Sequence, residues 1–306
     1  MPVAKLDFKR LNECSLTDAV NVWNEGFKGY FVDMTLTPKR YLERLHNEGL
    51  SQEYSLVAFI EGTPAGFLLS GIRTSGGMRV AWNGGTGVSP EFRKQGVGHA
   101  LVQAALDLYS AEGVELATLE AISTNEPAIA LYQKFGYELV DRLIFLLHEG
   151  RLEPFTRNRD SKPYRVRSVD PAAVSELDFY RCDAPWQTQW QSLILDNGEA
   201  VIAADANGVE VGYALFRKKF SDEGKLASVA LHQCEADPHR PDSAEIVASI
   251  LEHLYSPLDE ECRRSTANLR MSNQLVLTIL REAGFKTFVE QVHMRWNGEQ
   301  VKGETG

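Results

Sequence analysis

A glycine-rich turn between an expected strand and an expected helix is the part of this sequence best suited to chemistry. Residues 84–106 read GGTGVSPEFRKQGVGHALVQAAL. The pattern predicts a strand that ends near Val88 and a helix that begins directly at Gly96 to Gly98. Glycines let the backbone pass close to a ligand, and a helix N-terminus presents unbonded amides with partial positive charge. The segment therefore indicates a cradle for an anion, and a pyrophosphate is its natural occupant.

Two common pyrophosphate sites are excluded by the spacing of these glycines. The dinucleotide pattern G-x-G-x-x-G fails, because Gly96 and Gly98 are followed by Leu101 where a third glycine is needed. The P-loop pattern fails as well, because no Gly-Lys-Ser/Thr occurs. Arg93 and Lys94 add two full positive charges to the turn. A cradle of a different class is expected.

The segment resembles motif A of the GNAT superfamily, the acyl-CoA-dependent N-acyltransferases. The family pattern Arg/Gln-x-x-Gly-x-Gly/Ala is matched by Arg93-Lys-Gln-Gly96-Val-Gly98, after the usual Val-x-Pro at Val88. The family's second signature follows about 30 residues later. Its defining positions are filled by Asn125, Ala128, Leu131, Tyr132, Gly136 and Tyr137. The resemblance covers residues 5–148 well and residues 164–296 by shape only.

The resemblance implies that acetyl-CoA is the cosubstrate and that its pyrophosphate lies on the cradle. Its pantetheine arm would pair like an added strand with the end of the Val88 strand, and Asn125 matches the position that hydrogen-bonds this arm. The residues implied in cofactor binding are Val88, Arg93, Lys94, Gln95, Gly96, Val97, Gly98, His99, Ala100, Asn125 and Tyr132. No metal site is predicted.

The family chemistry implies direct attack by an amine, without a covalent enzyme intermediate. Val88 resembles the family's oxyanion donor through its amide, and Tyr132 matches the tyrosine that protonates the departing thiolate. A base must take a proton from the amine. Glu120, on the expected strand before Asn125, is the best candidate for that base, with Glu25 and Asp33 as alternatives.

The acceptor is not fixed by the motifs. Residues 25–41 lie where the family builds acceptor pockets, and their aromatic, amphipathic character suits many amines. We expect a small-molecule primary amine. The alternatives are a protein or peptide N-terminus, or a non-catalytic role as an acyl-CoA sensor.

The chain has 306 residues, which favours two domains of ordinary size. Alternating strand and helix patterns predict an α/β (mixed α+β) fold. The resemblance implies two GNAT-like domains, each a twisted, mixed, mostly antiparallel sheet flanked by helices. The expected boundaries are a catalytic domain over 1–148, a linker over 149–163, a degenerate GNAT-like domain over 164–296 and a flexible tail over 297–306.

An internal repeat supports the duplication. Asn125 precedes a Gly-aromatic pair by 11 residues, and Asn273 precedes another such pair by the same 11. The copies are unequal, because Leu280 stands where Tyr132 is expected and no glycine occurs between Cys234 and Ile250. We therefore predict that the second copy binds no CoA.

Composition and charge limit the kinds of binding partner that we expect for this chain. The net charge is −10, divided equally between residues 1–150 and the rest, so nucleic-acid binding is not expected. The four cysteines form no metal-type pair, and no leader or membrane-spanning apolar stretch is apparent. We expect a cytoplasmic monomer or homodimer without membrane contact.

Overall fold

The computed structural model describes residues 6–155 and 164–298. The chain divides into two compact units. The N-terminal unit comprises residues 1–140 together with 293–306, and the C-terminal unit comprises residues 141–292. Among the described residues, no helix is both long enough and apolar enough to cross a membrane. The elements of each unit are given below with their bounds.

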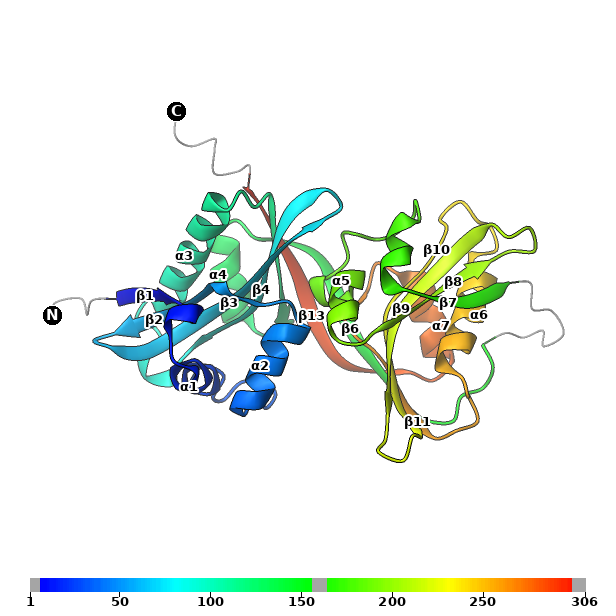
Figure 1. Ribbon diagram of the computed structural model, residues 1–306, viewed down its shortest axis with the longest axis horizontal. Coiled ribbons are helices and arrows are strands. Elements are labelled where there is room, and N and C mark those ends of the chain that lie inside the picture. Colours follow the sequence, from blue (N-terminus) through cyan, green and yellow to red (C-terminus); the bar gives the residue numbers. More distant parts are fainter. Residues whose placement is uncertain (1–5, 156–163, 299–306) are drawn as a thin grey trace. The chain divides into compact units, whose positions relative to one another are not determined.

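The N-terminal unit is a mixed sheet with helices on both faces (Figure 1). Antiparallel neighbours join β1 to β2, β2 to β3 and β3 to β4, and β4 pairs in parallel with β5. The helices α1 and α2 lie on one face, and α3 and α4 lie on the other. The elements are β1 (Leu6–Arg10), α1 (Leu16–Gly26), α2 (Pro38–Asn47), β2 (Ser51–Ile60), β3 (Thr63–Ser75), β4 (Met78–Val88), α3 (Val97–Ala111), β5 (Leu116–Ile122) and α4 (Glu126–Lys134), with short 3₁₀ turns at Leu11–Glu13 and Pro90–Phe92.

The first two helices begin where the sequence places their caps. The side chain of Ser15 accepts a hydrogen bond from the Asp18 amide at the start of α1, and Thr37 caps α2 in the same way. Pro38 occupies the first turn of α2, where its missing N–H costs nothing. Gly49 follows the helix at a φ of 65°. Local chemistry therefore sets the ends of the helices on this face.

The C-terminal unit has the strand order β6, β11, β10, β9, β8, β7, with β12 beside β6. Successive residues of β8 and β9 alternate between two apolar cores: Val201 and Ala203 pack with α6 and α7, whereas Ala200 and Ile202 pack with α5. The elements are β6 (Glu138–Gly150), β7 (Arg165–Val169), α5 (Trp190–Leu195), β8 (Glu199–Ala204), β9 (Glu210–Phe220), β10 (Leu226–Ala236), α6 (Ser243–Tyr255), β11 (Cys262–Thr266), β12 (Leu269–Arg270), α7 (Gln274–Glu282) and β13 (Lys286–Asn297), with 3₁₀ turns at Pro171–Glu176 and Trp186–Thr188.

The mixed sheets flanked by helices confirm the expected fold class. The division of the chain, however, differs from the expected boundaries. Residues 143–150 of β6 pair with β11 and β12 inside the C-terminal unit. The end of β13 belongs to the N-terminal unit, where the Gly298 amide donates a 2.9 Å hydrogen bond to the Glu115 carbonyl. Each unit thus takes strand residues from the other half of the sequence. Local patterns predict a strand but not its partner, which is why the sequence did not reveal this.

The expected linker over 149–163 lies partly outside the described residues. Its first residues belong to the C-terminal unit: β6 extends to Gly150, and Leu152 is buried in the core beside α6. The expected tail over 297–306 lies outside the described residues from position 299 onward.

The backbone supports duplication of one fold. Asn125 and Asn273 cap α4 and α7 with nearly equal backbone angles, φ −85° and ψ 63° against φ −81° and ψ 69°. Each accepts a hydrogen bond from the amide three residues ahead. The Gly-aromatic pairs that follow also agree, because Gly136 and Gly284 have φ values of 81° and 89°. The spacing found in the sequence therefore marks equivalent turns.

Candidate active site

The strands β4 and β5 separate in the middle of the sheet. Their parallel pairing covers only Val80–Asn83 against Leu116–Leu119, although β4 continues to Val88. The strands diverge at a β-bulge in β4. Leu69 of β3 pairs with Gly85, and the next residue, Ser70, pairs with Asn83, so Gly84 is the extra residue. A side chain on Gly84 would lie 2.6 Å from both Leu50 and the Trp82 ring. We call the opening between β4 and β5 beyond Asn83 and Leu119 the strand gap.

The Val88 amide is directed toward the strand gap. The Ser89 amide donates a 2.9 Å hydrogen bond to the Ala65 carbonyl on β3. Because amides of an antiparallel strand alternate between its two sides, those of Val88 and Thr86 point away from β3, toward β5. The amide of Val88, the predicted oxyanion donor, therefore points away from β3 and toward the strand gap.

The strand β4 ends and the helix α3 begins where the sequence predicts. Gly96 stands before α3 with a φ of 84°, a left-handed conformation that favours glycine. Gly98 is different, because its conformation is not left-handed and an added Cβ would meet only Leu131 at 3.6 Å and Val88 at 3.7 Å. The protein's own packing thus leaves room for a side chain there. Backbone that is open in this way fits a pyrophosphate.

The side chains of the cradle are largely engaged with the protein. Arg93 donates hydrogen bonds to the carbonyls of Val88 at 3.0 Å, Gly26 at 3.2 Å and Lys28 at 2.9 Å. Its guanidinium therefore ties the cradle to the ends of β4 and α1. Gln95 donates to the Glu91 carbonyl at 2.8 Å, and the His99 ring packs on Phe135 with centroids 4.6 Å apart. The first-turn amides over 97–99 and the exposed Lys94 are what the cradle offers to an anion, because the Ala100 amide already donates to the Gly96 carbonyl at 2.9 Å.

Tyr132 reaches the strand gap from α4. It is 7% exposed, and its hydroxyl is hydrogen-bonded to the side chains of Thr86 and Asn83. The Asn83 amide also donates to the Thr86 hydroxyl at 2.9 Å, so the three side chains form one network. Burial raises the pKa of Tyr132 above its ordinary value. The phenol therefore keeps its proton at neutral pH, as an acid must.

Glu120 is the first residue of β5 beyond the last β4–β5 pair. The indole of Trp82 donates a 2.7 Å hydrogen bond to Oε2 of Glu120. Burial is the main cause that raises the pKa of Glu120 to about 7, partly offset by the Trp82 bond. Its other oxygen, Oε1, lies 3.9 Å from Nε2 of His293, on β13. A carboxyl that titrates near 7 is suited to general base catalysis at neutral pH.

Glu120 and Tyr132 lie on opposite faces of the sheet. Trp82 and Asn83 are consecutive on β4, so their side chains point to opposite faces. Trp82 bonds Glu120, and Asn83 bonds Tyr132. The strand gap begins at these two residues. A base candidate and an acid candidate therefore flank the same opening.

The remaining candidates have other contacts. Asn125 accepts from the Ala128 amide as the cap of α4, and its side chain hydrogen-bonds Tyr30. Glu25 forms an exposed ion pair with Lys28 at 3.4 Å. Asp33 is exposed and accepts from the Thr35 amide at 2.9 Å. Glu120 alone among the three base candidates is buried.

The motif analysis missed Asn83, Thr86 and His293. Asn83 directly precedes the glycine-rich segment and Thr86 lies within it, but neither carries a pattern of its own. His293 is 173 positions from Glu120 in the sequence, and only the return of β13 to the N-terminal unit brings the two together.

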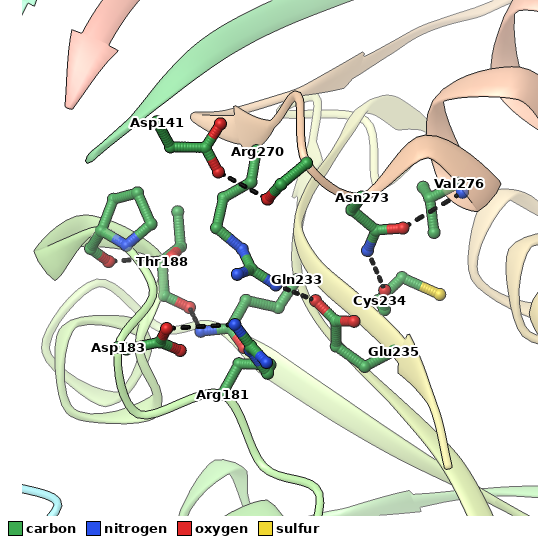
Figure 2. A network of polar contacts seen from close by, with 12 residues as sticks. Asp141, Arg181, Asp183, Thr188, Gln233, Cys234, Glu235, Arg270, Asn273 and Val276 are labelled. Atoms are coloured by element: carbon green, nitrogen blue, oxygen red, sulfur yellow. Dashed lines mark hydrogen bonds and ion pairs between the residues drawn. The ribbon is translucent and has the colours of Figure 1, made fainter. Parts of the chain in front are cut away.

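The equivalent gap in the C-terminal unit is crossed by internal bonds (Figure 2). The strands β10 and β11 pair over Ser228–Leu231 and then separate. Arg270 forms a 2.7 Å ion pair with Glu235, and the Asn273 amide donates to the Cys234 carbonyl at 2.9 Å. These residues line a cavity of about 430 Å³.

The start of α6 carries carboxylates where α3 has glycines. Asp242 precedes the helix and accepts hydrogen bonds from Arg240 at 2.8 Å and from the Tyr164 hydroxyl at 2.6 Å. Hydrogen bonding to Arg240 holds the pKa of Asp242 well below its usual range. Leu280, at the position of Tyr132, is fully buried in the apolar core.

Comparison with known proteins agrees with this geometry. Residues 18–137 match the Acetyltransferase (GNAT) family. This part of the chain is therefore a GNAT acetyltransferase domain. Its fold implies an acyl-CoA cosubstrate and N-acetyl transfer in general. No curated protein matches the chain in sequence.

Several solved structures share the fold over nearly the whole chain. The chain is similar to a tandem GNAT protein from the clavulanic acid biosynthesis pathway, with a TM-score of 0.60, 15% identity, and 96% of this chain and 99% of that chain covered. It is also similar to a GCN5-related N-acetyltransferase from Sphaerobacter thermophilus, with a TM-score of 0.61, 14% identity and 96% of each chain covered.

A third similar structure is the GCN5-related glucosamine N-acetyltransferase region of a fungal multi-domain GH3 β-N-acetylglucosaminidase. The TM-score is 0.69 at 16% identity, with 95% of this chain covered. The chain spans only 38% of that longer protein. At such identities these similarities show the fold.

Proposed function

We propose that the N-terminal unit transfers an acetyl group from acetyl-CoA to a small-molecule primary amine by direct attack in a ternary complex. The observation that carries this proposal is the placement of Glu120 and Tyr132 on opposite faces of the sheet at one strand gap. An amine that arrives on one face and a thiol that leaves on the other need a base and an acid in that arrangement.

In this mechanism each residue has one task. The α3 amides over 97–99 hold the pyrophosphate, and the Val88 amide donates a hydrogen bond to the oxygen that gains negative charge. Acetyl-CoA, when bound, supplies a thioester whose carbonyl carbon accepts the nitrogen lone pair. As the carbon–nitrogen bond forms and the carbon–sulfur bond breaks, Glu120 takes a proton from the amine and Tyr132 gives one to the sulfur. The products are an N-acetyl amine and CoA thiol.

The C-terminal unit takes another role in this proposal. We propose that it keeps the fold but binds no CoA. The carboxylates of Asp242 and Asp205 meet Arg240 at the start of α6, so the place of a pyrophosphate is already occupied by negative charge. The bonds from Arg270 and Asn273 cross the gap that an acyl arm would enter.

A panel of amines tests the proposed activity. The purified chain is mixed with acetyl-CoA and spermidine, glucosamine, lysine, an aromatic monoamine or a short peptide with a free N-terminus, and release of CoA thiol is measured. We expect turnover with at least one non-peptide amine. Turnover with the peptide only would favour a protein N-acetyltransferase. Binding of acetyl-CoA without turnover on any amine would favour an acyl-CoA sensor.

A further inference from the structure

The C-terminal strand places a buried histidine against the candidate base. His293, on β13, is 3% exposed, and Glu120, on β5, is 6% exposed. Nε2 of His293 lies 3.9 Å from Oε1 of Glu120. Both residues belong to the N-terminal unit, although β13 follows the whole second copy in the sequence. A positive charge on a histidine at this distance favours the ionised form of the carboxyl group.

The two oxygens of Glu120 have different surroundings. Oε2 accepts the hydrogen bond from the Trp82 indole, whereas Oε1 accepts none among the described residues. The other charged group that influences Glu120 is Glu48, at the end of α2, whose negative charge disfavours the ionised form of Glu120. Glu48 is itself held by Arg44 at 2.8 Å. His293 therefore faces the oxygen that lacks a hydrogen bond and can supply a positive charge to it.

We propose that His293 is a positioning residue for Glu120. Its imidazole orients the carboxylate from the side opposite Trp82, and in its protonated form it favours the ionised carboxylate that receives the amine proton. This inference rests on the proposed function, in which Glu120 is the base. A further consequence is that the catalytic centre of the first copy needs a residue from the end of the chain, which gives the second copy a part in catalysis without a CoA site.

The ionisation of Glu120 can be followed without knowing the acceptor. The full chain is labelled with [δ-¹³C]glutamate, and the carboxyl signal of Glu120 is assigned by its loss in Glu120→Gln. Its titration midpoint is then compared between the wild type and His293→Gln. We expect the midpoint to rise by about one pH unit in the variant, because an opposite charge within about 4–6 Å lowers a carboxyl pKa by one unit or more. An unchanged midpoint would overturn the inference.

Further variants separate this effect from loss of structure. His293→Phe keeps a ring of similar shape without the nitrogens, and it should show the same rise if the Gln variant folds poorly. His293→Lys keeps a cation and should hold the midpoint near that of the wild type. His239→Gln, at an exposed position in the C-terminal unit, is the matched control and should leave the midpoint unchanged.

Activity tells the two proposals apart. With acetyl-CoA and the most active amine of the panel, the acidic limb of kcat in His293→Gln should move upward by about the same one pH unit. The pH at the midpoint of this limb does not depend on the fraction of the sample that is folded, whereas the size of kcat does. Loss of activity in Glu120→Gln with an unchanged limb in His293→Gln would refute the role of His293 only. Full activity in Glu120→Gln would refute Glu120 as the base, and the role of His293 with it.

Discussion

The indole Nε1 of Trp82 donates to Oε2 of Glu120 across the last paired residues of β4 and β5, at 2.7 Å. The bond joins the strand that carries the Val88 amide to the strand that carries the proposed base. It thereby fixes the distance between the two strands where they begin to separate. The carboxylate is held at the edge of the strand gap rather than left to rotate in it.

The bond between Trp82 and Glu120 makes a prediction about pH. Hydrogen bonding to the ionised form lowers a carboxyl pKa, so Trp82→Phe should raise the pKa of Glu120 above its value of about 7. The wild type should gain activity as pH rises through about 7, when Glu120 loses its proton. The variant should lose activity at pH 7 and recover much of it at pH 9. The groups that face Glu120 in both proteins are His293 and Glu48, with Arg44 bound to Glu48.

This prediction is checked by the pH profile of kcat with one amine at saturation. The Glu120→Gln variant is the control, because its profile should lack the limb near pH 7 and keep only the titration of the amine itself. A limb at the same pH in wild type and Trp82→Phe would contradict the assigned role of the indole.

Glu120 should lower the stability of the fold above neutral pH. Its pKa is raised by burial, so the folded chain keeps a proton that the unfolded chain releases at about pH 4.3. Stability from this group is therefore present at low pH and is lost as pH rises through the folded pKa of about 7. Glu120→Gln keeps an acceptor for Trp82 without the charge. Thermal unfolding should show the variant more stable than wild type at pH 8.5 and similar to it near pH 4; equal differences at both values would contradict the argument.

Tyr132→Phe removes the proposed acid but keeps the ring. We expect kcat to fall by roughly 100-fold or more, the usual contribution of general acid catalysis. The affinity for acetyl-CoA should change little, because the hydroxyl contacts Thr86 and Asn83 rather than the cradle. Steady-state kinetics and calorimetry on the same preparation give both numbers. Leu280→Ala, at the matching position of the second copy, should leave the affinity for acetyl-CoA unchanged, whereas a kcat of wild-type size in Tyr132→Phe would remove Tyr132 from the mechanism.

Much of the site could be predicted because its parts are local in sequence. The cradle needs a glycine with positive φ at Gly96, a small residue at Gly98 and a helix start, and all three lie within a few positions. Tyr132 follows Asn125, the capping residue of its helix, by seven positions, so the cap and the proposed acid come from one short motif.

The rest could not be predicted because it depends on pairing between distant strands. His293 reaches Glu120 only through the exchange of strand residues between the two units. The role of Arg93 also depends on tertiary contacts, since the sequence shows its charge but not the Gly26 and Lys28 carbonyls that it binds. Resemblance to a family predicts a pyrophosphate contact for Arg93, and the structure adds its hydrogen bonds between the cradle and the end of α1.

Gly98 separates ligand binding from folding. Gly98→Ala adds a Cβ at ordinary contact distances from Leu131 and Val88, so the variant should unfold at the wild-type temperature. Gly98→Glu adds a negative charge in the first turn of α3, where it suits the helix but repels a pyrophosphate. Acetyl-CoA affinity should fall at least about 100-fold, from a like-charge repulsion of a few kcal/mol. Calorimetry measures the affinity and thermal unfolding measures the stability. An unchanged affinity in Gly98→Glu would refute the cradle.

The number of CoA molecules per chain tests the inequality of the two copies. At the start of α3, the N-terminal unit has helix amides beside Gly98, where the packing leaves room for a Cβ. At the start of α6, the C-terminal unit has Asp242, which is bound by Arg240 and Tyr164. Calorimetric titration of the full chain with acetyl-CoA should give one equivalent at saturation. Gly98→Glu should abolish that equivalent without exposing a second one, because the carboxylates at the start of α6 remain. Two equivalents in the wild type, or one persisting in Gly98→Glu with unchanged affinity, would show that the second copy has kept a CoA site.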